Sequence, residues 1–329
     1  MTSEHRFILF VSCIVAASAG GYLARRRGWL NPNWARPIMS AAIIGCDAPI
    51  AWLAIWFLAL DSNVWKVPAA GAAVGVATSL VGLWIARWRR LGPAEAPLFA
   101  LQGSMGNVGY TLGGALAFMI WDIQGLALEQ MFCMMWPFFA FLFCFPIGRH
   151  YGEMIACSTE RLSPLAYGAR TLWRSLTDLR SLPLYMATLG LALNLHGAPP
   201  PEWVKDWHLI DGLMVLGILM QFGGVGMTVQ ARKLPVFWKL AMGSATLKFL
   251  VSPALMLAAT ALAGMPWWSD PRPFYVCMLL SVMPTALYSV LMANLFNLNR
   301  DLANTTFVLT HALCFAVLVP VIIVWRAVM

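Results

Sequence analysis

Residues 102–114 read QGSMGNVGYTLGG, and this stretch interrupts a segment of otherwise apolar chain. Its five glycines favour unwound backbone over continuous helix. Unwound backbone at membrane depth is tolerated only where protein or a water-filled cavity satisfies its amide and carbonyl groups. Asn107, Tyr110 and Thr111 add polar groups that helix packing alone does not need. The stretch therefore predicts an interrupted membrane helix, with close packing through its small residues as the alternative.

The chain as a whole has the composition of a polytopic α-helical membrane protein. Of its 329 residues, 60% are hydrophobic and 11% are charged, whereas soluble domains average about 45–50% apolar and about 25% charged residues. At about 20 residues per span, this length has room for about ten membrane helices. We expect them near 7–24, 35–60, 67–86, 98–121, 126–148, 182–197, 208–230, 238–264, 274–296 and 303–326.

The net charge of +8 comes from short basic runs between the apolar segments, a pattern typical of membrane topology rather than of nucleic-acid binding. Sixteen Lys and Arg residues fall in the loops after odd-numbered spans, whereas only Lys66, Lys205 and Arg272 follow even-numbered spans. Because cytoplasmic loops retain Lys and Arg, the bias predicts a cytoplasmic-membrane protein with both termini outside the cytoplasm. The loop 149–181 is then a cytoplasmic linker.

That linker divides the chain into two sets of five spans, 1–148 and 182–329. An odd number of spans per half requires the second half to enter the membrane inverted, as in many secondary transporters. A sequence echo at an offset of 169 residues supports this expectation, although a bundle without duplication is the alternative. The echo pairs Gly21, Gly28, Pro32 and Trp34 with Gly190, Gly197, Pro201 and Trp203.

The ninth span, like the fourth, is expected to be broken. Pro284 removes a backbone donor and clashes with the preceding turn, and it is followed by Thr285, Tyr288 and Ser289. Interruptions at corresponding places in two halves are the best sequence indication of a transporter's binding site. We therefore expect these residues to bind substrate together with Gly106, Asn107, Tyr110 and Thr111.

Three ionisable residues lie within apolar stretches, where a central Asp or Lys costs at least about 2.5 kcal/mol. Lys248 either attracts an anionic substrate group or is a structural cation paired with a carbonyl or with Asp47. Asp47 either carries a coupling proton or caps a helix broken near Pro49. For His311 the preferred interpretation is a hydrogen-bonded interior histidine, and proton coupling is the alternative.

Catalytic and metal-binding motifs are absent from the sequence. It contains no HExxH, no GxSxG and no pair of intramembrane Asp residues, and its five histidines are dispersed. We therefore expect neither an enzyme nor a metal or other cofactor. A membrane sensor or receptor that binds ligand without moving it is the main alternative to a transporter, and a membrane-embedded enzyme is the weaker one.

The chain resembles the auxin efflux carrier family and, more distantly, the bile acid/sodium symporter superfamily. The resemblance rests on residues 21–30, on Gly106-Asn107-Val108-Gly109-Tyr110, on residues 247–253, and on Met283-Pro284-Thr285 followed by residues 293–296 and Asp301. These motifs cover almost the whole ten-span layout. One departure is Gly113-Gly114, where the family usually has a proline.

The resemblance implies two inverted five-helix repeats whose broken spans four and nine cross at the substrate site. It also implies a scaffold of spans 1, 2, 6 and 7, a moving transport domain of spans 3–5 and 8–10, elevator-like motion and a homodimer formed through the scaffold. The expected substrate is a small organic anion, such as an auxin-like acid or a mono- or dicarboxylate. No acidic sodium site is evident beside the crossover, so the coupling ion is left open.

Overall fold

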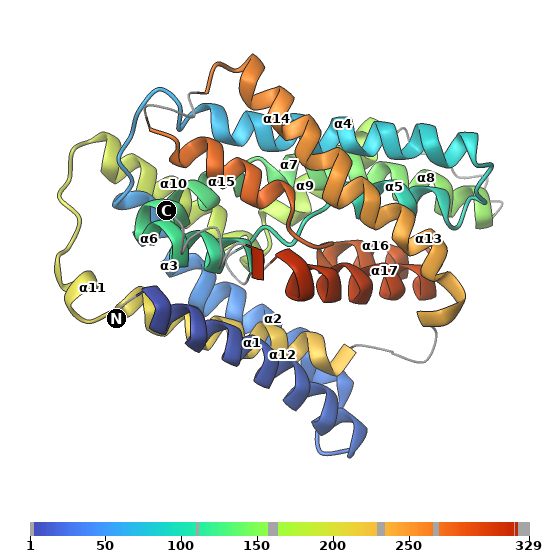
Figure 1. Ribbon diagram of the computed structural model, residues 1–329, viewed down its shortest axis with the longest axis horizontal. Helices are drawn as coiled ribbons and strands as arrows, with labels where there is room; N and C mark the ends of the chain where they lie inside the picture. The colour runs from blue at the N-terminus through green and yellow to red at the C-terminus, as the bar shows by residue number, and fades with distance from the viewer. Residues whose placement is uncertain are drawn as a thin grey trace. The chain divides into compact units, whose positions relative to one another are not determined.

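The computed structural model describes residues 3–109, 112–156, 164–228, 234–265, 270–318 and 320–321. Within these ranges every named element is helical, and the only β-type pairing is an isolated bridge between Gly106 and Thr285. The chain forms two compact units, each assembled from separate parts of the sequence (Figure 1). The expected all-helical class is confirmed.

Unit 1 comprises Met1–Val64, Gly109–Met134 and Ser175–Val229. Its helices are α1 (Ser3–Arg26), α2 (Ala35–Ala42), α3 (Ala48–Trp56), α6 (Gly113–Cys133), α10 (Leu182–Leu195), α11 (Trp203–Asp206) and α12 (Leu209–Thr228), with the short turns η1 (Pro32–Trp34), η2 (Ile43–Asp47) and η4 (Leu179–Ser181). Helix α6 is two helices joined at a turn, because Trp121 and Asp122 have non-helical backbone angles.

Unit 2 comprises Trp65–Val108, Met135–Arg174 and Gln230–Met329. Its helices are α4 (Lys66–Trp88), α5 (Ala96–Ser104), α7 (Trp136–Phe138), α8 (Phe145–Ala156), α9 (Pro164–Leu176), α13 (Leu234–Thr246), α14 (Ser252–Leu262), α15 (Arg272–Ser281), α16 (Leu287–Leu295) and α17 (Arg300–Leu313), with the turns η3 (Phe139–Cys144), η6 (Leu247–Val251) and η7 (Cys314–Leu318). The last residues of α9 belong to unit 1.

Six helical stretches of the described chain are long and apolar enough to cross a membrane. They are Ile8–Arg26, Pro32–Trp56, Lys66–Trp88, Gly113–Ala156, Leu209–Thr228 and Pro235–Leu262. The predicted fourth and ninth spans are divided after Ser104 and Ser281, and α10 has only 14 residues. The full set of ten spans therefore stays a prediction.

Four π-helical turns, η2, η3, η6 and η7, share one feature of sequence. Each of them ends two residues before a proline, at Pro49, Pro146, Pro253 and Pro320. A proline has no N–H and clashes with the carbonyl four residues earlier, so a locally wider turn lets the helix continue. The predicted break near Pro49 is accordingly wrong: helix α3 follows η2 directly, and the Asp47 side chain makes no capping hydrogen bond.

Unit 1 is built on two close helix pairs, α1 with α12 and α10 with α3. A Cβ on Gly21 of α1 would stand 2.1 Å from the Gly223 carbonyl oxygen of α12. A Cβ on Gly190 of α10 would stand 2.3 Å from the Trp52 carbonyl oxygen of α3. Small residues let membrane helices approach closely, and at these two positions no side chain fits.

The two units agree with the expected scaffold and transport groupings except in one segment. Unit 1 contains the predicted spans 1, 2, 6 and 7, as expected for the scaffold, but it also contains Gly109–Met134. The reason is direct contact within unit 1. The Arg6 guanidinium pairs with Asp122 at 2.8 Å, and the Phe10 and Phe118 rings stack with centroids 6.4 Å apart.

Candidate functional site

The two predicted helix interruptions are present, and the parts of them that meet lie in unit 2. Helix α5 ends at Ser104, and the chain does not re-enter a helix until α6 begins at Gly113. Helix α15 ends at Ser281, and α16 begins at Leu287, on the far side of Pro284. Glycine-rich backbone and a proline thus break the two segments for the reasons expected from their sequences.

The broken segments pair with each other through their backbones. Gly106 and Thr285 form an antiparallel bridge. On either side of it, the Asn107 N–H donates to the Pro284 carbonyl at 2.6 Å, and the Ala286 N–H donates to the Met105 carbonyl at 2.8 Å. Backbone groups that have lost their helical partners therefore satisfy each other, as a membrane interior requires.

Lys248 brings a buried cation to this junction. It lies in η6, and its side chain is almost fully enclosed, with 2% of the residue exposed. Its Nζ atom is 2.7 Å from the point that a Cβ on Gly106 would occupy. Among the described residues no carboxylate forms a salt bridge with Lys248. The pairing with Asp47 that was one possibility for this lysine stays a prediction, because Asp47 belongs to unit 1 and Lys248 to unit 2.

His311 also contacts the interrupted segments. Its Nδ1 atom is 2.8 Å from the Phe307 carbonyl oxygen, and since a carbonyl only accepts, we assign the ring proton to Nδ1. Its Nε2 atom is then an acceptor, 3.4 Å from Nδ2 of Asn107. His311 is 9% exposed and its ring lies against Phe307. These contacts fit the hydrogen-bonded interior histidine expected from the sequence.

Neutral polar side chains hold the junction in place. Thr285 is fully buried, its hydroxyl donates to the Gln102 carbonyl at 3.0 Å, and its N–H donates to the Thr310 hydroxyl at 3.2 Å. The Gln102 amide donates to the Ala303 carbonyl at 2.9 Å and lies 3.3 Å from the Ser289 hydroxyl. Helix α17 therefore positions both interruptions.

The structure brings together most of the predicted site residues, but not all of them. Gly106, Asn107, Pro284, Thr285, Lys248 and His311 converge, as the preceding contacts show. Ser289 is fully buried against Gln102, and the Tyr288 ring packs edge-on against Trp136 at 4.6 Å. Tyr110 and Thr111 lie outside the described residues.

The three evenly spaced glycines of the fourth span occupy different environments. A Cβ on Gly103 would stand 2.6 Å from the Leu247 Cβ, so this glycine allows close packing of α5 against η6. Gly106 faces Lys248, and no neighbouring atom lies within 4 Å of a Cβ on Gly109. Both alternatives for this stretch therefore occur. Close packing is found at Gly103, and the interruption follows from Gly106 onwards.

Asp47 belongs to a second polar cluster, which is partly buried in unit 1. It hydrogen-bonds to the Gln130 side chain. The Gln130 amide donates to Oε2 of Glu129 at 2.9 Å, and the Cys133 thiol donates to Oε1 at 3.0 Å. Glu129 is fully buried, and its Oε2 lies 2.7 Å from where a Cβ on Gly114 would stand. This carboxylate gives a physical reason for glycine at the position where the sequence departs from the family pattern.

Parts of the chain are similar in sequence to known transport proteins. Residues 173–323 match the model of a family described as membrane transport protein. A curated relative, the probable auxin efflux carrier component 9 of Oryza sativa subsp. japonica, is 26% identical over 164 residues. The resemblance to the auxin efflux carrier family is confirmed.

The matched family is described as a membrane transport protein and the matched relative as an auxin efflux carrier component, so both matches are to transport proteins. The alignment with the auxin efflux carrier covers 48% of this chain and 38% of that relative, so the chain matches less than half of the relative's length. The family match includes Lys248, Pro284, Thr285 and His311, whereas the first interruption, with Gly106 and Asn107, lies outside it.

In this auxin efflux carrier-like chain, three residues that make buried polar contacts were not identified from the sequence. Glu129 is a lone acid inside the apolar stretch 126–148, a signal that was available. Gln102 and Thr310 carry no such signal, because neutral polar residues are common in membrane helices and only their contacts reveal the role. In the described part of the chain, no group of three or more His, Cys, Asp or Glu residues could hold a metal ion.

Proposed function

We propose that the protein is a secondary active transporter of a small organic anion, with the substrate bound at the junction of the two interrupted helices. The observation that carries the proposal is the enclosed ammonium of Lys248 beside Gly106, without a carboxylate partner among the described residues. A lysine buried in a membrane costs at least about 2.5 kcal/mol unless it is compensated. A substrate carboxylate supplies that compensation.

Backbone N–H groups at the junction are already hydrogen-bonded, which limits the groups that can bind the anion. The N–H groups of Asn107 and Ala286 already donate across the bridge, and the Thr285 N–H donates to Thr310. These amides are therefore not available to a carboxylate. Lys248, with the N-terminal end of α16 adding partial positive charge, is left as the main source of attraction for an anion.

The inverted repeat is part of the proposal, and three observations support it. The paired residues Gly28 and Gly197 both have left-handed backbone, with φ of 74° and 69°, just after α1 and α10. A second pair in the sequence echo, Gly21 and Gly190, lies at close helix contacts in both halves. Span 1 packs on span 7 while span 6 packs on span 2, which is the exchange that two repeats related by a twofold axis produce.

The finer features of the mechanism follow from this arrangement as proposals. We place the first repeat at 1–148, the linker at 149–181 and the second repeat at 182–329. The protein lies in the cytoplasmic membrane with both termini outside, forms a homodimer through the scaffold helices and moves substrate by elevator-like alternating access. The auxin-like acids and the mono- and dicarboxylates are the substrate classes that the buried lysine fits.

Flux measurements test the proposal. The protein is reconstituted in liposomes, and uptake of a panel of labelled organic acids is followed with and without imposed proton or sodium gradients. We expect saturable uptake of at least one carboxylate. We expect no uptake of an organic cation of similar size. Binding of a carboxylate without uptake under any gradient would instead identify a sensor.

A further inference from the structure

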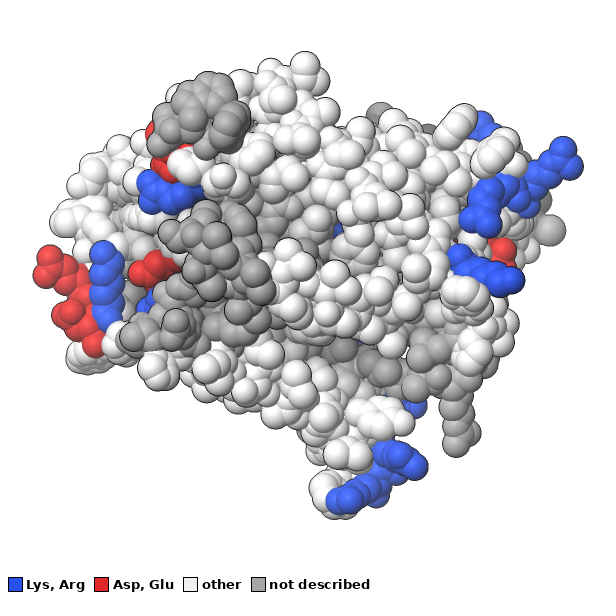
Figure 2. Space-filling model, viewed as in Figure 1, with Lys and Arg blue, Asp and Glu red and all other residues white. Residues whose placement is uncertain are grey.

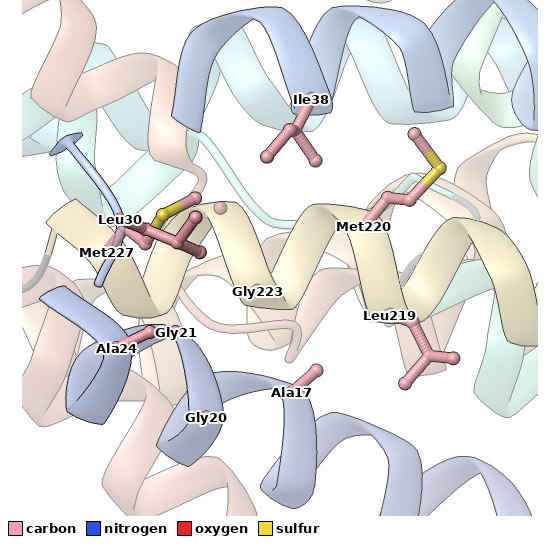
Figure 3. Close-up of a pocket in the computed structure, with 11 residues that line it drawn as sticks. Ala17, Gly20, Gly21, Ala24, Leu30, Ile38, Leu219, Met220, Gly223 and Met227 are labelled. Carbon is pink, nitrogen blue, oxygen red and sulfur yellow. The ribbon is translucent and has the colours of Figure 1, made fainter. Parts of the chain in front are cut away.

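An apolar groove runs along unit 1 between α1, α12 and the start of α2 (Figure 3). Its volume is about 240 Å³, and it is open on one side. It is lined by Ala17, Gly20, Gly21, Ala24, Leu30, Ile38, Leu219, Met220, Gly223, Gly224 and Met227. No charged or amide side chain contributes to this lining, so the groove offers contact with hydrocarbon and nothing that would orient a polar ligand.

The shape of the groove suits a hydrocarbon chain. At Gly21 the helices touch, but at the adjacent Gly20 no atom lies within 4 Å of the position that a Cβ would take, so space opens beside the contact. The volume is below the about 300 Å³ at which pockets for compact drug-sized ligands begin. A flexible acyl chain needs only a channel of its own width, and each buried methylene contributes about 0.8 kcal/mol.

A basic cluster stands at one end of the groove. The Arg25 guanidinium donates to the carbonyl of Met227, a groove residue, at 3.1 Å. Arg26, Arg27 and Arg36 are exposed around the turn that joins α1 to α2. Figure 2 shows the blue side chains gathered at this turn, with no red side chain beside them in that view. Trp29 is 69% exposed at the same turn and lies under Arg27 at 5.0 Å.

The opposite end of α1 shows how this protein neutralises an arginine with its own acids. There the Arg6 guanidinium pairs with Asp122 at 2.8 Å and with Asp211 at 2.6 Å. At the groove end, neither residues 5–46 nor residues 212–228, which supply the lining, contain an Asp or Glu. The cluster therefore presents positive charge that these segments do not balance.

We propose that this part of unit 1 binds an anionic phospholipid, with an acyl chain in the groove and the headgroup phosphate held by Arg26, Arg27 and Arg36. Arginine matches phosphate geometry, and an exposed tryptophan belongs at the headgroup level. A second copy of the chain is a poorer occupant, because a twofold contact at the groove brings two basic clusters towards each other. The orientation expected from the loops places the cluster at the cytoplasmic leaflet, where anionic lipids concentrate.

Lipid titration of the purified protein tests the site. Native mass spectrometry in detergent measures binding of phosphatidylglycerol and of phosphatidylcholine with identical acyl chains. We expect the wild type to prefer phosphatidylglycerol. Since each arginine near a surface contributes about 1 kcal/mol, Arg26→Gln with Arg36→Gln weakens phosphatidylglycerol binding roughly 30-fold and removes the preference. Gly20→Leu adds a side chain whose Cβ has no neighbouring atom within 4 Å, and because it occupies the groove it weakens binding of both lipids.

Matched controls separate the site from general effects. Gly212→Leu makes the same change at an exposed α12 position where no atom lies within 4 Å of a Cβ, and Arg87→Gln with Arg170→Gln removes two exposed charges elsewhere. Both controls retain wild-type lipid binding. The proposal would be overturned if the wild type bound the two lipids equally, or if inorganic phosphate alone competed with the lipid. It would also be overturned if the Gly20→Leu variant no longer formed a dimer but still bound lipid.

Discussion

At the scale of single residues, the decisive feature is a cation enclosed beside interrupted backbone. Reasoning from sequence identified Lys248 because an ionisable residue in an apolar stretch has to face protein or water. It did not show that Gly106 is the residue in front of the ammonium, since that contact joins positions far apart in the chain. Glu129 was missed altogether, although the same argument applies to it.

Replacing Lys248 separates its role in binding from its role in folding. Lys248→Met keeps most of the apolar stem and deletes the charge, so substrate affinity should fall roughly 10- to 100-fold, the equivalent of one charge-assisted hydrogen bond. Lys248→Arg should retain part of the affinity because the charge survives. Binding is measured with the carboxylate identified by the flux panel, and thermal unfolding is followed in parallel. Normal binding by Lys248→Met, or its unfolding, would return Lys248 to a structural role.

A methyl group at Gly106 tests the same contact without removing charge. In Gly106→Ala the new Cβ stands 2.7 Å from the Lys248 Nζ, so the flexible lysine tip has to move. We expect weaker anion binding with little change in thermal stability. Gly109→Ala is the matched control, because no atom lies within 4 Å of its Cβ. Equal affinity in the two variants would show that the ammonium position does not matter.

At the scale of elements, the sequence predicted the two helix interruptions because glycine and proline act locally. It did not predict the four π-helical turns, because a proline alone is compatible with a break, a kink or a wider turn. It also did not predict which helices pair. That choice depends on glycines meeting backbone on helices far away in the chain, as Gly21 meets Gly223 and Gly190 meets Trp52.

The contact at Gly21 should be among the least tolerant helix positions. Gly21→Ala places a Cβ 2.1 Å from the Gly223 carbonyl oxygen, which is rigid backbone, so α1 and α12 have to separate. A destabilisation of about 1–3 kcal/mol is typical of such overpacking. Thermal unfolding in detergent should show a lower midpoint than that of the wild type. Gly212→Ala on α12 should leave the midpoint unchanged or raise it, because its Cβ meets no atom and alanine favours helix.

At the scale of the whole molecule, the apolar spans were predictable because a bilayer imposes their length and composition. Their grouping was only partly predictable. Gly109–Met134 belongs to unit 1 because of contacts such as Arg6 with Asp122 and Gln124 with the Phe57 carbonyl. These contacts join residues far apart in the chain, so no local sequence pattern predicts them. The two helix interruptions, by contrast, were predictable, because glycine and proline break helices locally inside an apolar sequence.

Orientation in the membrane is the prediction that belongs to this scale. The bias of sixteen basic residues to three predicts that tags at either terminus are accessible from outside the cytoplasm. A tag in the loop 149–181 should be accessible only from inside. Protease protection or impermeant labelling in intact cells and in inverted vesicles distinguishes the two sides. A cytoplasmic terminus would reverse the orientation or change the number of spans.

The π-helical turns set the angular phase of the helices that contain them. In an α-helix each residue advances the side-chain direction by about 100°, and a wider turn absorbs a residue without that advance. Side chains from Ser252 onwards in α14 are therefore rotated by about 100° from where an unbroken continuation of α13 would point them. Deleting one residue within η6 would close the wide turn and change the direction of Lys248 relative to one half of its own span.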